Sequence, residues 1–183
     1  MDCEMLHSEI ALHSEVILIE RKDEHMNDQD KLMYTVAITE VINRYFAALD
    51  QKQFDGTTMS QIFADDAKVQ RPNRTTMTGP SEIGLSHSQS LSRFQATQHL
   101  TSGFIITLKD DTSAEFRANV VAMHLWAEGQ GDPSAEPNDN YFLAGLVITG
   151  QVTLGADGWR ITEIIGQATW RRGTGFQEML KTK

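Results

Sequence analysis

The sequence predicts an α+β fold, a cone-shaped α+β barrel in which N-terminal helices pack on a strongly curved, mostly antiparallel sheet. Apolar residues first recur at three- and four-residue steps, which indicates amphipathic helices. After Phe94 the apolar period changes to two, which indicates long strands. Consecutive strands with short connections favour an antiparallel meander, and helices that precede a sheet cover one of its faces. The interior of such a cone can hold a small molecule.

The helical part begins with a long helix expected from Tyr34 to Asp50. A second, short helix is expected over Phe54 to Phe63, and residues 67–70 are expected to form a strand. Gly79-Pro80 then interrupts the chain, and Ser81 is expected to cap a third helix that runs to about Phe94. These helices supply the layer that covers the sheet.

Four long strands are expected at residues 95–108, 113–128, 141–154 and 159–170, with turns or loops at Asp110-Asp111, residues 129–140 and residues 155–158. On the second of them an apolar face of small residues alternates with a polar face, and His124 lies on the apolar face. We therefore expect His124 to point inward. Gly103 is a candidate bulge that would switch the faces of the first strand, so periodicity alone does not place His99.

Composition restricts the function. The chain has 183 residues and 40% hydrophobic residues, which suits one domain with a packed core. A formal net charge of -9 argues against nucleic acid and anionic membranes as partners. No apolar run reaches the roughly 18 residues of a membrane span. A single cysteine, Cys3, favours the reducing cytoplasm.

The chain divides into three expected segments. Residues 1–30 are expected to form an N-terminal extension that is partly disordered. This segment contains a short duplication and three histidines, but the histidines lack the spacing of a metal site. Residues 31–176 form the expected domain, and residues 177–183 a C-terminal tail. No metal ion and no cofactor are expected.

Four residues could move protons on an organic substrate: Tyr45, Asp50, His99 and His124. A carboxylate at a helix C-terminus, such as Asp50, is disfavoured by the helix dipole, and a protonated imidazole would compensate it. Taken by itself, Asp50 is more often a solvent-exposed aspartate that opens a turn.

The segment from about Leu32 to Phe176 resembles the SnoaL-like branch of the nuclear transport factor 2-like superfamily. The residues that carry the resemblance stand in the same order and spacing: Arg44-Tyr45-Phe46-Ala47-Ala48-Leu49-Asp50, Phe63-Ala64-Asp65-Asp66-Ala67, Thr78-Gly79-Pro80, Thr97-Gln98-His99, Asp157-Gly158-Trp159-Arg160 and Thr169-Trp170-Arg171. The fold that this resemblance implies is the cone described above.

The resemblance also implies a chemistry. Scytalone dehydratase, bile-acid 7α-dehydratase and hexachlorocyclohexane dehydrochlorinase, which belong to this superfamily, are cofactor-free lyases with an Asp–His dyad. By analogy Asp50 and His99 form that dyad, His124 matches a second catalytic histidine, and Tyr45 a catalytic tyrosine. The expected function is thus a cofactor-independent dehydratase acting on a small hydrophobic, secondary-metabolite-like molecule.

Further residues are expected to bind the substrate. The expected apolar walls are aromatic: Phe54, Trp126, Tyr141 and Trp170. Arg171 is expected to reach a substrate carboxylate. Thr149 is the one polar residue, beside Val147, where scytalone dehydratase has polar side chains on this strand, so a different substrate is expected.

Three alternatives keep the same fold. An isomerase or cyclase of a polyketide or terpenoid intermediate would use the same proton abstraction. A ligand-binding or assembly module, or the small subunit of a ring-hydroxylating dioxygenase, would not need the dyad. An outward apolar row of Val121, Met123 and Leu125 predicts a homo-oligomer, a trimer in preference to a dimer.

Overall fold

The structure is a computed structural model, and it describes residues 26–174. The described part falls into two compact units that divide between Met33 and Tyr34. The predicted extension up to residue 25 and the predicted tail at residues 177–183 lie outside the described residues.

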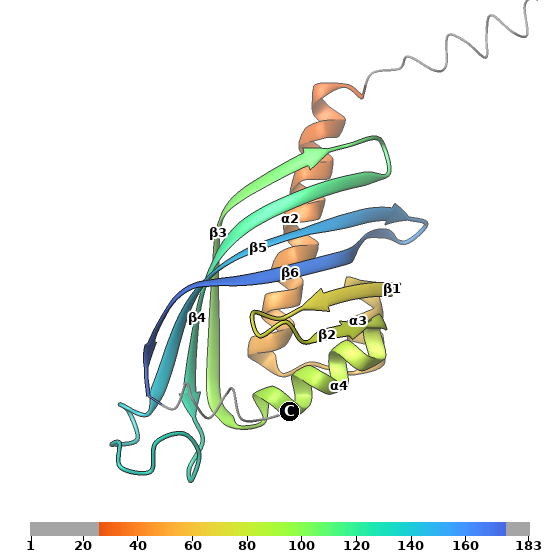
Figure 1. The fold of residues 1–183 in the computed structure, drawn as a ribbon. Helices are drawn as coiled ribbons and strands as arrows, with labels where there is room; N and C mark the ends of the chain where they lie inside the picture. The colour runs from red at the N-terminus through yellow and green to blue at the C-terminus, as the bar shows by residue number, and fades with distance from the viewer. Residues whose placement is uncertain (1–25, 175–183) are drawn as a thin grey trace, which may run out of the picture. The chain divides into compact units, whose positions relative to one another are not determined.

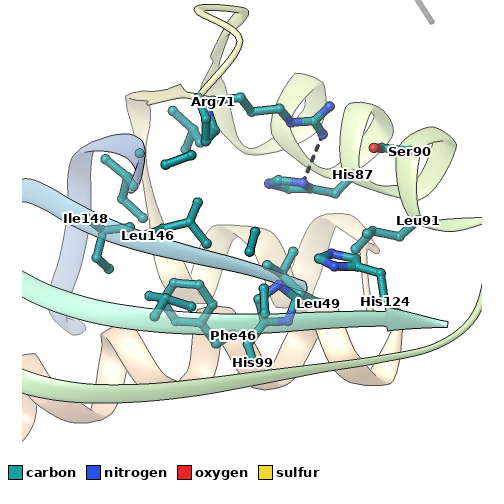
Figure 2. A pocket seen from close by; sticks show the side chains of 18 of the residues that line it. Phe46, Leu49, Arg71, His87, Ser90, Leu91, His99, His124, Leu146 and Ile148 are labelled. Atoms are coloured by element: carbon teal, nitrogen blue, oxygen red, sulfur yellow. Dashed lines mark hydrogen bonds between the residues drawn. The ribbon is translucent and has the colours of Figure 1, made fainter. Parts of the chain in front are cut away.

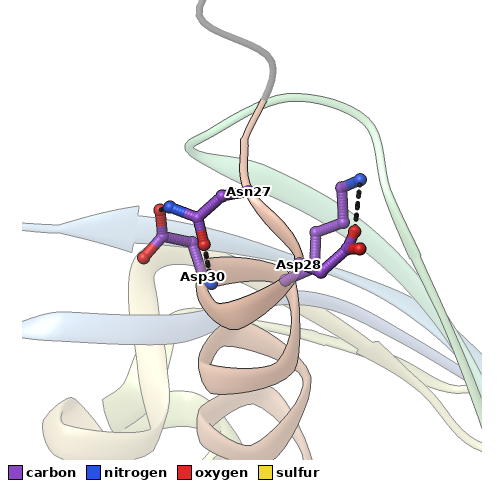
Figure 3. Close-up of polar contacts among 4 residues, drawn as sticks. Asn27, Asp28 and Asp30 are labelled. Atoms are coloured by element: carbon purple, nitrogen blue, oxygen red, sulfur yellow. Dashed lines mark hydrogen bonds and ion pairs between the residues drawn. The ribbon is translucent and has the colours of Figure 1, made fainter.

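The first helix, α2 (Asp28–Gln51), begins six residues earlier than Tyr34, the predicted start. Asn27 caps it: the Asn27 side-chain carbonyl accepts the backbone N–H of Asp30 at 2.9 Å, and the Asn27 amide donates to the Asp30 carboxylate at 2.6 Å. Lys31 pairs with Asp28 one turn on. Figure 3 shows Asn27, Asp28 and Asp30 at this end of the helix. These polar contacts, rather than apolar periodicity, define the first turn, which is why the periodicity missed it.

Within the second unit, α2 turns one apolar stripe to the core. The buried residues follow the predicted three- and four-residue steps: Ile38, Val41, Ile42, Tyr45, Phe46, Ala48 and Leu49. The helix ends where Lys52 adopts a left-handed conformation (φ 55°), so that the next backbone N–H, that of Gln53, bonds back to the carbonyl of Ala48 at 2.9 Å. Asp50 therefore lies in the last turn, as expected.

Two short helices and two strands follow. Helix α3 (Gly56–Ile62) is capped by Asp55 and is shorter than the predicted helix. Strand β1 (Phe63–Gln70) starts before the predicted strand, and β2 (Thr76–Thr78) was not predicted because three residues are too few to show a period.

Helix α4 (Gly79–Leu91) corrects one prediction, since its cap is not Ser81. Its N-cap is Thr78, and Pro80 occupies the first turn, where a missing N–H costs nothing. The Glu82 carboxylate accepts the Thr78 backbone N–H at 2.8 Å. Gly79-Pro80 thus starts the helix instead of interrupting the chain before it.

Four long strands complete the second unit: β3 (Phe94–Leu108), β4 (Ser113–Trp126), β5 (Tyr141–Gly155) and β6 (Gly158–Gly173). The sheet order is β2-β1-β6-β5-β4-β3, and all neighbours are antiparallel except β1 and β6. The long strands bend strongly along their length (Figure 1). The predicted α+β class with a mostly antiparallel sheet is confirmed. The described sheet is curled but not closed, because β2 and β3 remain its edges.

Gly103 is a bulge, as expected. It has a φ of 60°, and the register between β3 and β4 shifts between Ser102 and Ile105. Before the bulge the odd-numbered residues Thr97 and His99 face inward, and after it the even-numbered residues do. The bulge therefore lets both halves of a 15-residue strand turn a face to the core.

No helix among residues 26–174 is long and apolar enough to cross a membrane. Within the second unit, the apolar residues of α2, α3 and α4 form one buried cluster with those of the sheet. An opening in that cluster holds the candidate site.

Candidate active site

A cavity of about 230 Å³ lies between α2, α4 and the inner face of the sheet. Most of its wall is apolar, with contributions from Phe46, Leu49, Leu91, Val120, Leu146 and Ile148. Four proton-handling side chains reach it: Tyr45, His87, His99 and His124. In Figure 2, Arg71 and His87 lie on one side of the cavity, and His99 and His124 lie on the other. An apolar chamber with a few polar groups is typical of a small-molecule site.

Asp50 and His99 are in direct contact. The Asp50 carboxylate lies 2.6 Å from Nδ1 of His99, accepts the backbone N–H of His99 at 2.9 Å, and accepts the Thr97 hydroxyl at 3.1 Å. Burial raises the pKa of Asp50, but the hydrogen bonds from His99, its charge and the Thr97 hydroxyl together outweigh burial and lower it. An ionised carboxylate only accepts, so Nδ1 of His99 carries the proton and Nε2 keeps its lone pair in the neutral ring.

His124 faces inward, as its position on the apolar face of β4 predicted. Its ring stacks on Phe142 at 4.3 Å between ring centroids and meets the ring of His99 edge-on at 5.5 Å. Burial, reinforced by the charge that His99 carries when it is protonated, lowers the pKa of His124 to about 3, against the opposing effects of Asp50 and the Phe142 backbone. Among the described residues nothing hydrogen-bonds to the buried Nδ1 of His124. The His124 ring lines the cavity, so it can contact a ligand there.

Tyr45 belongs to a second network, which the sequence reasoning missed. The Tyr45 hydroxyl lies 3.0 Å from Nε2 of His87, and Nδ1 of His87 lies 3.0 Å from the Arg71 guanidinium. A guanidinium only donates, so Nδ1 accepts and Nε2 of the neutral ring donates to the Tyr45 oxygen. The proton of Tyr45 is then left for another acceptor.

The protonation states fit this network. Burial, together with the positive charges of Arg71 and His99, lowers the pKa of His87 to about 3. Burial also raises the pKa of Tyr45 above its usual value, despite the nearby charge of Arg71. At neutral pH the site therefore holds a neutral phenol and a neutral His87.

A sequence signal for His87 existed. Ile83, His87 and Leu91 recur at four-residue steps along α4, and all three are buried. A histidine in register with two core positions of an amphipathic helix must point to the interior. Arg71 had no comparable signal, because it lies in the turn after β1, where periodicity ends.

Of the six residues expected to bind the substrate, only Arg171 lines the cavity, and the other five lie outside its lining. Trp126 is buried behind it against Phe94 and Phe142, and its indole N–H donates to the Thr174 carbonyl at 3.2 Å. Thr149 is exposed on the opposite face of β5.

The remaining aromatic residues also lie outside the lining of this cavity. Phe54 borders a separate depression between α3 and α4, and Tyr141, like Thr149, alternates away from the inward residues of β5. Trp170 covers the Cα of Gly145 and is 46% exposed. The register between β5 and β6 shifts at this point, because Gly145 pairs with Trp170 and Leu146 with Ala168. That shift explains how Arg171, rather than its neighbour, comes to line the cavity.

Within residues 26–174 no group of three or more His, Cys, Asp or Glu side chains is arranged to hold a metal ion. The described site consists of two short hydrogen-bonded networks in an apolar chamber.

The fold and the site define a small α+β protein in which helices cover a curled, open sheet and an apolar cavity lies between them. The chain belongs to the SnoaL-like domain family, whose model matches residues 31–165. No curated protein matches the sequence.

Solved structures show the same fold. A scytalone dehydratase candidate from Novosphingobium aromaticivorans is 18% identical, with a TM-score of 0.69 over 80% of this chain and 91% of that one. The hexachlorocyclohexane dehydrochlorinase LinA-type3 from Novosphingobium barchaimii is 17% identical, with a TM-score of 0.66 over 80% and 94%. A nuclear transport factor 2-like protein from Salmonella enterica is 18% identical, with a TM-score of 0.63 over 80% and 98%. At these identities the similarity establishes the fold.

Proposed function

We propose that the chain is a cofactor-independent lyase, a dehydratase, that acts on a small hydrophobic molecule in the cavity. The observation that carries the proposal is the 2.6 Å contact between the Asp50 carboxylate and Nδ1 of His99, at the wall of an apolar chamber. This contact orients the ring and stabilises the imidazolium that forms when Nε2 takes a proton. The structural similarity to a scytalone dehydratase candidate and to a dehydrochlorinase supports a lyase.

In the proposed reaction, Nε2 of His99 removes a proton from a carbon next to a carbonyl. The C–H electron pair moves into an enolate, whose oxygen takes the negative charge. The enolate then expels the β-hydroxyl, which leaves as water with a proton from the site. Afterwards His99 loses the proton that it took and the donor regains the proton that it gave, so the sum is the loss of one water.

Tyr45 is the proposed donor to the departing hydroxyl. Its oxygen already accepts from Nε2 of His87, so its own proton is available. His124, whose neutral ring lines the cavity beside His99, is proposed to hydrogen-bond the substrate. Positioned acid and base groups contribute about 10²–10⁴-fold each, and exclusion of water strengthens their electrostatics.

The test uses a panel of β-hydroxy carbonyl compounds with apolar bodies, followed by mass spectrometry in heavy water. We expect loss of water, and deuterium at the carbon next to the carbonyl in unreacted substrate. His99→Ala and Asp50→Asn should abolish both. Thr101→Val is the matched control, because it removes another hydrogen bond between β3 and α2 (Thr101 to Asn43, 2.7 Å) from a residue that does not line the cavity.

Activity retained in both dyad variants, with folding intact, would overturn the proposal. An isomerase or cyclase starts with the same proton abstraction, so a product of unchanged mass that still requires His99 would select that alternative. Ligand binding without exchange or turnover, unaffected by Asp50→Asn, would select a binding module.

A further inference from the structure

The cavity carries a charge opposite to that of the protein. The chain has a formal net charge of -9, yet each charged residue among the described ones that line the cavity is an arginine: Arg71, Arg93 and Arg171. No aspartate or glutamate of the described part lines it. Low-dielectric walls lined by one sign of charge concentrate ligands of the other sign. An acidic protein with a cationic cavity therefore selects anions there.

Among the described residues no carboxylate pairs with Arg71. It is partly buried, and none of the ion pairs within residues 26–174 includes it. Its contact is with the neutral ring of His87, which occupies one N–H of a group that has five. Burial and the charge of Arg93 lower the pKa of Arg71, although a guanidinium stays protonated at neutral pH. A partly buried cation without a counter-ion is a costly arrangement unless a ligand supplies the anion.

We propose that Arg71 binds a carboxylate of the ligand, so that the substrate of the proposed dehydratase is an apolar carboxylic acid. The planar guanidinium fork matches a planar carboxylate with two parallel hydrogen bonds. His87 holds the guanidinium by its Nη2, which leaves other N–H groups for the ligand. The apolar walls then enclose the body of the molecule.

The arrangement also orients the ligand. Arg71 and His87 face His99 and His124 across the cavity (Figure 2). A carboxylate bound at Arg71 places the apolar body toward the opposite wall, where Nε2 of His99 would meet a carbon at a distance from the acid group. This inference rests on the proposed function for the identity of the reacting end, while the charge preference itself does not depend on turnover.

The test compares two probes of equal shape by isothermal titration calorimetry: hydrocinnamate, which carries a carboxylate, and hydrocinnamamide, which carries a neutral amide. We expect the wild-type protein to bind hydrocinnamate about 10- to 100-fold more tightly, the usual effect of hydrogen bonds to a charged group. In Arg71→Gln this ratio should fall to about 3-fold or less, with the affinity for the amide unchanged.

Two further variants separate charge from folding. Arg71→Lys keeps the charge without the fork and should keep part of the preference. Arg74→Gln is the matched control, because Arg74 is exposed in the same turn and does not line the cavity, and its ratio should equal that of the wild type. Thermal unfolding of each variant shows whether a lost ratio reflects a lost fold.

Several results would overturn the inference. The wild type could bind both probes with equal affinity, or bind neither. The preference for the carboxylate could also survive in Arg71→Gln but disappear in His99→Asn, which would assign the carboxylate to the Asp50–His99 dyad. Tighter binding of phenethyl phosphate than of hydrocinnamate would assign the site to phosphate esters instead. A carboxylate preference that depends on Arg71, in a protein without dehydratase activity, would support this inference while the proposed function fails.

Discussion

Replacing Asp50 by asparagine should destabilise the fold in a manner that depends on pH. The carboxylate accepts three hydrogen bonds, from Nδ1 and the backbone N–H of His99 and from the Thr97 hydroxyl. Asparagine keeps one oxygen, and its NH₂ group would face donors that the second carboxylate oxygen now satisfies.

The magnitude follows from those contacts. A hydrogen bond to a charged group contributes about 1.5–3 kcal/mol, and a neutral one about 0.5–1.5 kcal/mol. A quarter of the Asp50 side chain is exposed, so solvent weakens the charged contacts. We therefore expect Asp50→Asn to lower the free energy of unfolding by about 2 kcal/mol at neutral pH.

The pH dependence has a defined sign. The pKa of Asp50 is lowered in the folded state, so its ionised form stabilises the protein above the unfolded value of about 3.9, and this contribution disappears as the pH falls through the folded value. Urea unfolding of wild type and Asp50→Asn from pH 7 downward should show a difference that shrinks below pH ~4. A difference that stays constant to pH ~3 would refute an ionised Asp50 in the folded protein.

Three more predictions concern single positions. His124→Phe should change the free energy of unfolding at pH ~7 by less than about 1 kcal/mol, since it removes an unsatisfied buried nitrogen, while activity falls. In the wild type, the unfolded chain takes up a proton on His124 below pH ~6.5 while the folded protein does not until pH about 3, so the free energy of unfolding falls over this range. In His124→Phe this fall should be smaller, and an unchanged slope of unfolding free energy against pH would contradict the prediction. Gly103→Ala should cost about 1–2 kcal/mol in urea unfolding, since φ is 60° and a Cβ would meet the Asn119 side chain, and a neutral effect would mean that the bulge relaxes. Met123→Glu should convert the proposed oligomer to monomer in light scattering, because Met123 is 39% exposed on the outer face of β4, and an unchanged mass would locate the interface elsewhere.

Alternation along a strand predicted which face of the sheet a side chain occupies, because the backbone alone decides this. His124 lies on the buried face of β4 because no bulge interrupts that strand, so the period of two holds over its whole length. The bulge at Gly103 was also readable, because glycine in a strand pattern marks such a site. The Asp50–His99 contact required the family resemblance, since the two residues are 49 positions apart.

The remaining site residues depend on information that a local pattern lacks. The register shift between β5 and β6 turns Arg171, and not Trp170, to the inner face of the sheet. No glycine lies at that point of β6 to indicate the shift from the sequence. Trp126 points inward, as expected, but it packs against Phe94 and Phe142 and not against the cavity. Periodicity does not predict which inward side chains line a cavity and which pack behind them. His87, in contrast, could be predicted from the buried stripe on α4.

The Asp50 carboxylate has a second consequence, for association between chains. Strand β3 is an edge of the sheet, and its exposed backbone groups offer a template on which another strand could pair. One carboxylate oxygen of Asp50 accepts the backbone N–H of His99, a donor that points away from β4. The residue that positions the histidine ring thus also blocks the middle of the open edge. An Asp50→Asn protein should accordingly form fibrils or strand-paired dimers more readily than the wild type, and a dye that reports cross-strand assembly would detect the difference.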